Sequence, residues 1–319
     1  MCTAISWPGS VHCFGRNLDL ERSYGEAVAV TPRNYPLSLR CGETLRRHHA
    51  MIGMAHVAGG YPLYYEATNE HGLSMAGLNF PESAVYHPRA EGKANIAPFE
   101  LIPWLLGRCA TLDQARSALE NLNIWAESFA PQMPATPLHW LIADKTGALT
   151  VESTVYGLQL YENKPRVLTN EPLFPFHRAN LRQYSALTPD PLPESFSRGA
   201  GSFGLPGGLD SVSRFVRAAF TAANALPGED EPQSVSQFFH LLAAVAQTNG
   251  CVRLPDGSCQ YTLYSCCCTD SGVYYYTTAA NRALTAVDMR REDLEGAAVV
   301  SYPLRTAPQV TWEQSKGSL

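Results

Sequence analysis

The second residue of the chain, Cys2, carries a thiol directly after the initiator position. Cysteine is small enough for an initiator methionine to be trimmed, so we expect Met1 to be removed and Cys2 to carry a free α-amine. An α-amine titrates at about pH 7.7–8.0 and a thiol at about pH 8.5, so the amine can take the thiol proton near neutrality. This combination is typical of N-terminal nucleophilic catalysis, in which one residue supplies nucleophile and base.

A predicted hairpin bears on whether that residue is held in place, because chain termini are usually loose. Residues 2–7 and 11–17 alternate apolar and polar side chains around Pro8-Gly9-Ser10, which predicts two strands joined by a turn. If the strands pair symmetrically about this turn, Cys2 lies opposite Arg16 on the same face of the ribbon.

Arg16 and Asp19 are the charged residues that this pairing brings near Cys2. A guanidinium beside a thiol favours the thiolate. The Asp19 carboxylate is placed to accept a hydrogen bond from the terminal amine. The competing interpretation is a solvated ion pair between Arg16 and Asp19 at a strand end, which is a common surface feature.

Other elements follow from hydrophobic periodicity. Strands are expected at residues 27–32, 51–56, 63–68, 73–80, 138–144, 149–153, 159–162, 261–269 and 273–278, and helices at 97–107, 111–122, 213–225 and 234–246. Thr111 and Gln114 form a capping box for the second of these helices. We read residues 189–208, rich in Pro, Ser and Gly, as an internal loop.

Many strands joined by short turns predict an α+β protein in which antiparallel sheets carry helices on their outer faces. With 319 residues the chain is long enough for two domains, but a single layered domain over residues 2–319 is the preferred interpretation.

Composition excludes several classes of function. The net charge is −5 without a Lys/Arg-rich block, which argues against nucleic-acid or anionic-membrane partners. Apolar stretches such as residues 101–106 are far shorter than the ~20 residues that cross a bilayer. The first residues lack the basic start and apolar core of a secretory signal, and the nine cysteines form an odd set. We therefore expect reduced thiols and a cytoplasmic protein.

Other reactive side chains receive structural interpretations. Cys251, Cys259 and the run Cys266-Cys267-Cys268 predict buried small hydrophobic residues and no metal site, because adjacent strand residues point to opposite faces. The stretch 46–49, Arg-Arg-His-His, predicts a solvated loop face, and His139 a core or wall histidine. Phosphate-loop, dinucleotide, serine-elbow and zinc-protease motifs are missing from the sequence.

Longer motifs in order along the chain resemble the choloylglycine hydrolase family of N-terminal-nucleophile hydrolases, which includes bile salt hydrolases and penicillin V acylases. They are Met-Cys-Thr at the start, Phe-Gly-Arg-Asn-Leu-Asp at 14–19, Asn-Glu-His-Gly-Leu at 69–73, Ala-Gly-Leu-Asn-Phe-Pro at 76–81, Leu-His-Trp at 138–140, Val-Leu-Thr-Asn at 167–170, Gly-Leu-Pro-Gly at 204–207, Ser-Arg-Phe at 213–215, Tyr-Ser-Cys at 264–266 and the tyrosines 274–276.

The resemblance implies a four-layer αββα sandwich that needs no metal or organic cofactor, assembled as a homotetramer. It implies that Cys2 is the nucleophile, and it assigns the other polar site positions to Arg16, Asp19, Asn79, Asn170 and Arg214. Asn170 would be the oxyanion donor. Without the resemblance, an asparagine at a strand end is usually a turn former and an arginine such as Arg214 points to solvent.

The substrate follows less directly. Loops expected to border the site carry apolar side chains that suit a sterol or aromatic acyl group, namely Leu20, Tyr24, Ala58, Tyr61, Phe129 and Met133. The resemblance favours glycine- or taurine-conjugated bile salts, with penicillin V as the alternative amide. If Met1 is retained, the expectation changes to a silent protein that binds acyl amides.

Overall fold

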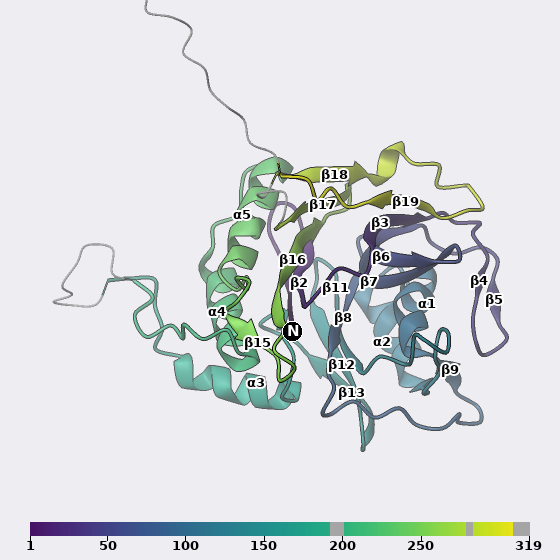
Figure 1. Ribbon diagram of the computed structural model, residues 1–319, viewed down its shortest axis with the longest axis horizontal. Helices are drawn as coiled ribbons and strands as arrows, with labels where there is room; N and C mark the ends of the chain where they lie inside the picture. Colours follow the sequence, from purple (N-terminus) through teal and green to yellow (C-terminus); the bar gives the residue numbers. More distant parts are fainter. Residues whose placement is uncertain (192–200, 279–282, 309–319) are drawn as a thin grey trace, which may run out of the picture.

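The structure is a computed structural model that describes residues 1–191, 201–278 and 283–308. Two large β-sheets lie face to face in it, with α3, α4 and α5 outside one sheet and α1 and α2 outside the other (Figure 1). The four layers thus run α-β-β-α, as the sequence and its resemblance predict.

The first sheet carries the start of the chain. Its order is β14-β1-β2-β16-β17-β18, with β15 paired to β16, and neighbouring strands are antiparallel. The strands are β1 (Cys2–Trp7), β2 (Cys13–Leu20), β14 (Val167–Leu168), β15 (Val252–Arg253), β16 (Cys259–Cys268), β17 (Gly272–Thr277) and β18 (Thr285–Asp288).

The second sheet has the order β13-β12-β11-β8-β7-β6-β3-β19 and is also antiparallel. Its strands are β3 (Glu26–Thr31), β6 (Met51–Ala58), β7 (Tyr61–Asn69), β8 (Ser74–Asn79), β11 (Leu138–Ala143), β12 (Ala148–Thr154), β13 (Gly157–Glu162) and β19 (Val300–Pro303). Two small pairs lie outside these sheets, the antiparallel β4 (Leu37–Ser38) with β5 (Thr44–Leu45) and the parallel β9 (Ala94–Ile96) with β10 (Leu122–Ile124).

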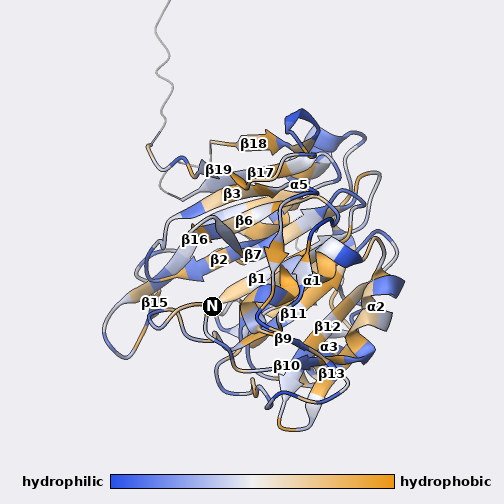
Figure 2. Ribbon diagram, turned by 90° about the vertical axis from the view of Figure 1, so that its right-hand side faces the viewer, coloured by the Kyte–Doolittle hydropathy of each residue, from blue (hydrophilic) through white to orange (hydrophobic). Residues whose placement is uncertain are grey.

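The helices cover the outer faces of the sheets. They are α1 (Leu101–Arg108), α2 (Leu112–Glu120), α3 (Phe174–Leu181), α4 (Ser211–Asn224) and α5 (Glu231–Ala243), with short 3₁₀ turns η1 (Pro98–Glu100), η2 (Arg182–Tyr184) and η3 (Met289–Arg291). Seven of the eight residues of α1 are buried, and Figure 2 shows this helix mostly in hydrophobic colours. No helix of the described residues is long and apolar enough to cross a membrane.

All of the predicted strands and the four predicted helices are present, with ends displaced by a few residues. The additional strands are two to four residues long, too short for an alternation signal. Helix α3 was not expected because only two of its eight residues, Phe174 and His177, are buried. Of the loop expected at 189–208, residues 192–200 lie outside the described residues.

The hairpin register differs from the symmetric prediction. Cys2 pairs with Leu18 and Arg16 pairs with Ala4, so the predicted pairing of Cys2 with Arg16 is wrong. The connection contains five residues, because Trp7 pairs with Cys13. A shift of two positions leaves every side chain on its face, since strand residues alternate with period two.

The capping box at α2 is half right. The Thr111 hydroxyl accepts the backbone N–H of Gln114 at 3.3 Å, as predicted for an N-cap. The Gln114 side chain, however, accepts the N–H of Ala110 at 2.7 Å, one residue before the cap. Helix α4 begins at Ser211 and not at Ser213, because the Asp210 side chain accepts the Ser213 N–H at 2.9 Å.

Candidate active site

Cys2 lies at the start of β1 with only 2% of its surface exposed. Its backbone N–H donates to Oδ1 of Asn170 at 2.7 Å. Its carbonyl oxygen accepts a hydrogen bond from Nη1 of Arg214 at 2.5 Å. The peptide groups on both sides of the thiol are therefore fixed by side chains from later parts of the chain.

Asn170 follows β14 and is oriented by a set of hydrogen bonds. Its side-chain Nδ2 donates to the carbonyl of Asn79, the last residue of β8, at 2.8 Å. Its backbone N–H donates to the Ser211 hydroxyl at 2.9 Å. Because an amide nitrogen has two hydrogens, one Nδ2–H of Asn170 is left for another acceptor. The turn-former interpretation does not describe this buried asparagine.

Arg214 lies in the first turn of α4 and is fully buried, so the expectation that it points to solvent is wrong. Besides the Cys2 carbonyl, it donates to the Thr3 hydroxyl at 2.5 Å, to Asn170 Oδ1 at 3.0 Å and to the Leu209 carbonyl at 2.9 Å. Burial lowers the pKa of Arg214, and the neighbouring acidic groups oppose that shift.

Arg16 projects from β2 of the first sheet into the space between the sheets. Its Nη1 donates to the carbonyls of Gly77 at 2.5 Å and Tyr65 at 3.3 Å, both in the second sheet. Burial works against its charge, but the Cys2 thiol and Glu66 raise the pKa of Arg16 above its ordinary value. The solvated ion pair with Asp19 is therefore wrong, because both side chains are buried.

Asp19 has one satisfied and one unsatisfied carboxylate oxygen. Oδ1 accepts the hydroxyl of Thr262 at 2.6 Å, whereas Oδ2 is buried with no hydrogen-bond partner among the described residues. Burial raises the pKa of Asp19, and Arg214 opposes this shift. An unpartnered carboxylate oxygen in a buried position is costly and is expected mainly where function requires it.

Met1 occupies the space beside Asp19. Its amine donates to the backbone carbonyl of Asp19 at 2.8 Å and to Oε1 of Gln260 at 2.9 Å, and its own carbonyl accepts the Asp19 N–H at 3.1 Å. Burial is the main reason that the pKa of this amine is lowered. With Met1 present, the nitrogen of Cys2 is an amide and not a base.

A cavity of 660 Å³ opens beside these residues and is lined by Arg16 and Asn79 together with a larger number of apolar side chains. Four of the predicted binding residues line it, namely Leu20, Tyr24, Phe129 and Met133. Tyr61 lies behind this wall, with its ring 5.6 Å from that of Phe129, and Ala58 ends β6 and is not part of the lining.

Several lining residues were not expected from the sequence. Phe99 and Ile102 come from η1 and α1, and Trp140 comes from β11. Each lies within an ordinary apolar run, so the sequence carries no signal that separates it from core residues.

The remaining histidine and cysteine interpretations are mostly confirmed. His139 is fully buried, its Nε2 is 2.9 Å from the Thr169 carbonyl, and its ring stacks on Phe80 at 4.1 Å. The run 266–268 is buried, but Cys251 is exposed and Cys259 half-buried, so the expectation was wrong for those two. None of the nine cysteines forms a disulfide.

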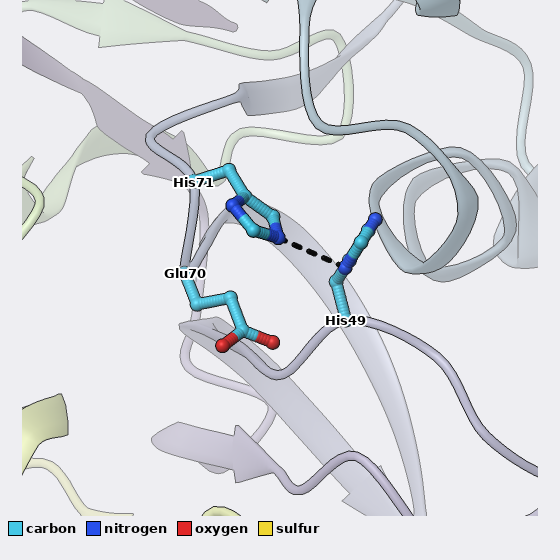
Figure 3. A group of neighbouring side chains, drawn as sticks. All are labelled: His49, Glu70 and His71. Carbon is cyan, nitrogen blue, oxygen red and sulfur yellow. Dashed lines mark hydrogen bonds between the residues drawn. The ribbon is translucent and has the colours of Figure 1, made fainter.

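One group outside the cavity has the donors of a metal site. Ligand atoms of His49, Glu70 and His71 lie within 4.8 Å of one another (Figure 3). The two Glu70 oxygens already accept four hydrogen bonds, from Arg33 and the Ala50 N–H, and the imidazoles bond to each other at 3.0 Å. A carboxylate has about four acceptor sites, so Glu70 has none left for an ion.

The loop face that the sequence predicted at 46–49 is partly wrong. Arg46 and Arg47 are exposed, but His48 is buried and its two ring nitrogens lie 2.7 and 2.8 Å from the backbone carbonyls of His49 and Tyr35. The His48 ring fills space beside the end of α1, where polar burial is satisfied by backbone partners.

Comparison with known proteins agrees with this geometry. The family model described as linear amide C–N hydrolases, choloylglycine hydrolase family, matches residues 2–302. A bile salt hydrolase/transferase from Lactiplantibacillus plantarum is 46% identical, over 97% of this chain and 98% of its own. A bile salt hydrolase/transferase from Clostridium perfringens is 35% identical, over 95% of this chain and 96% of its own.

Solved structures agree as well. A mutant conjugated bile acid hydrolase from Clostridium perfringens superposes with a TM-score of 0.91 at 32% identity, covering 98% of this chain and 100% of that one. Penicillin V acylase from Agrobacterium tumefaciens gives 0.75 at 20% identity, covering 94% and 90%, which is a likeness of fold alone.

The fold is therefore the αββα sandwich of the N-terminal-nucleophile hydrolases. Within that class, the chain belongs to the choloylglycine hydrolase family and is a hydrolase of linear amide C–N bonds.

Proposed function

We propose that the protein hydrolyses the amide bond of glycine- or taurine-conjugated bile salts, with Cys2 as N-terminal nucleophile. The observation that carries the proposal is the clamping of Cys2 by Asn170 and Arg214 close to Arg16, which borders an apolar cavity. The names of relatives at 46% and 35% identity support the bile salt as substrate.

Removal of Met1 is the first requirement of this mechanism. It turns the Cys2 amide, 2.7 Å from Asn170 Oδ1, into a primary amine. The unpartnered Oδ2 of Asp19 supports a role in holding that amine. The amine then accepts the thiol proton, and the positive charge of Arg16 favours the thiolate that results.

Acylation and deacylation use the same groups. The sulfur attacks the amide carbonyl, and the free Nδ2–H of Asn170 stabilises the oxyanion together with groups near Asn79. The protonated amine gives its proton to the leaving nitrogen as the C–N bond breaks, which leaves a thioester. The amine then removes a proton from water, which attacks the thioester and releases the bile acid.

The cavity supports an apolar acyl group of some size. Its volume of 660 Å³ falls within the usual range for small-molecule sites, about 300–1,000 Å³. Leu20, Phe129 and Met133 supply apolar walls, and Tyr24 adds an aromatic rim. We propose that Ala58 and Tyr61 shape this wall from outside it.

Substrate choice is tested with three amides. Equal amounts of enzyme receive glycocholate, taurocholate or penicillin V, and the released amine is measured. The expected result is a clear kcat/KM preference for a conjugated bile salt. A preference for penicillin V would overturn the proposed substrate and leave the hydrolase class unaffected.

Replacement of the nucleophile is the next test. Cys2→Ala is expected to abolish turnover, and Cys2→Ser to reduce kcat by about 100-fold or more, because a hydroxyl is a far weaker nucleophile at neutral pH. The intact mass of the wild-type preparation shows whether Met1 has been removed. Full activity of either variant rejects the nucleophile, and a wild-type enzyme that keeps Met1 without turnover supports a silent binding protein.

Assembly and location are part of the proposal. We propose a homotetramer, which sedimentation equilibrium would report as four times the 34.9 kDa chain. We propose a cytoplasmic location, supported by nine cysteines of which none is in a disulfide. No metal or organic cofactor takes part in the proposed reaction.

A further inference from the structure

Glu66 is a buried carboxylate that the proposed mechanism does not use. It belongs to β7 of the second sheet, and its Oε2 lies 3.5 Å from Nη1 of Arg16 in the first sheet. The side chains are 0% and 1% exposed, so solvent screens this pair very little.

Two donors from β16 hold the other oxygen of this carboxylate. The Tyr264 hydroxyl donates to Oε1 at 2.8 Å, and the Cys266 thiol donates to the same atom at 3.0 Å. Oε2 has no hydrogen-bond partner within the part of the chain that the structure describes. The carboxylate is thus anchored at one oxygen, while the other faces the guanidinium.

Two β-bulges place these groups at one point between the sheets. The pairing of β16 with β2 shifts between Thr262 and Tyr264, and the pairing of β6 with β7 shifts so that Tyr65 is the extra residue. The carbonyl of Tyr65 accepts a hydrogen bond from Arg16 at 3.3 Å. Bulges often re-aim side chains beside active sites, so this arrangement is a built feature of both strands.

Arg16 therefore serves two acidic groups at once. The Cys2 thiol and Glu66 each raise the pKa of Arg16, against the effect of burial. A negative charge on Glu66 offsets part of the positive potential that Arg16 exerts at the Cys2 sulfur.

The proton on Glu66 is exchangeable near neutral pH. Burial raises the pKa of this carboxyl to about 7, while Arg16, Cys266 and Tyr264 oppose the shift. These three groups face it from β2 and β16, and Tyr65 is the neighbouring titratable group on its own strand. Below that pH the group is neutral, and above it the group is an anion beside Arg16.

We propose that Glu66 is a positioning residue that orients Arg16 and, through its charge, sets how strongly Arg16 stabilises the Cys2 thiolate. With a proton on Glu66, the potential of Arg16 acts fully on the sulfur. Without that proton, the carboxylate takes up part of the potential, and thiolate formation requires a higher pH. The inference rests on the proposed function only in taking Cys2 as the reactive thiol.

The test measures the thiolate directly. The rate of Cys2 alkylation by iodoacetamide is followed across pH for wild type, Glu66→Gln and Glu66→Asp, with the modified peptide identified by mass. The midpoint of the Glu66→Gln profile is expected to fall by about half to one pH unit. Glu66→Asp retains the charge and should keep the wild-type midpoint. Tyr264→Phe, which removes a donor to the carboxylate, should move it in the same direction by less.

Glu70→Gln is the matched control. This residue is also an arginine-paired carboxylate and follows β7 directly, but its partner is Arg33, outside the cavity. Its alkylation midpoint should equal that of wild type. An unchanged or raised midpoint in Glu66→Gln overturns the proposal, even if thermal stability changes, because that result describes a purely structural residue.

The inference and the proposed function fail separately. Alkylation needs no substrate, so an enzyme that is inactive on bile salts yet shows the midpoint shift refutes the proposed substrate and supports the role of Glu66. An enzyme that cleaves bile salts but shows no shift supports the proposed function and overturns the role of Glu66.

Discussion

Asp19 and Asn170 hold the first residues of β1 from opposite sides, but they differ in how well they are satisfied. Asn170 accepts two hydrogen bonds at Oδ1 and donates one from Nδ2. Asp19 is buried with only one of its two oxygens bonded by a side chain. A carboxylate kept in this state lowers the stability of the fold, which is consistent with retention for chemistry.

Asp19→Asn is expected to reduce kcat/KM by about 100-fold or more, because the charge beside the Cys2 amine is lost. Burial raises the pKa of Asp19, so the folded state binds its proton more tightly than the unfolded state. Ionisation therefore costs stability as pH rises, and the variant should have a higher free energy of unfolding than wild type at pH 7. Denaturant unfolding at several pH values checks this, and the difference should shrink in acid.

Asp144→Asn is the control with the opposite sign. Burial opposes ionisation there, but hydrogen bonds from Thr146 and the Leu112 N–H lower the pKa of Asp144 overall. Its carboxylate stabilises the fold above the unfolded pKa, so the variant should lose about 1–2 kcal/mol at pH 7 and keep its activity. A stabilised Asp144→Asn or a destabilised Asp19→Asn would contradict this account.

At the scale of elements, α4 is the helix that brings a side chain to the site. Arg214 lies in its first turn, one residue after Ser213, whose N–H is capped by Asp210. Helix α5 has an equivalent cap, in which Asp230 accepts the Gln233 N–H at 2.9 Å, but none of the proposed site residues lies on it. The two caps separate the effect of helix stability from the effect on the site.

Asp210→Ala and Asp230→Ala should each lower the free energy of unfolding by about 1 kcal/mol, the usual effect of losing an N-cap. Only Asp210→Ala should also lower kcat/KM, because fraying of the first turn loosens the contact between Arg214 and the Cys2 carbonyl. Urea unfolding and bile salt hydrolysis measure the two effects. Equal losses of activity in both variants would show that the cap does not act through Arg214.

At the scale of the whole molecule, the two sheets depend on one another. The larger buried cluster combines side chains from both, including Ile5 and Phe14 from the first and Ile52 and Leu141 from the second. Arg16 adds polar contacts across the same interface through the carbonyls of Tyr65 and Gly77. Neither sheet can bury its inner face without the other, which supports one domain.

Calorimetry is expected to show a single cooperative unfolding transition for the chain, with tryptophan fluorescence and far-UV circular dichroism changing at the same temperature. Saturation with a conjugated bile salt, using Cys2→Ala to prevent turnover, should raise that temperature, because ligand binds only the folded state. Two separated transitions would argue for two domains in place of one.

The sequence by itself determined the parts that depend on near neighbours. The alternation in residues 2–7 and 13–17 predicts the hairpin, and Cys2, Asn79 and Arg214 stand out through short motifs. The β-strands of the two large sheets that are longer than four residues were all predictable, because their apolar periodicity extends over enough positions to be detected.

Only the tertiary structure decided which groups meet. Arg16 bonds to carbonyls 49 and 61 residues further along the chain, and the donors to Glu66 come from about 200 residues away. The two-residue shift of the hairpin and the bulge at Tyr65 are equally invisible locally. Strand register and burial depend on packing between sheets, and no local pattern contains that free energy.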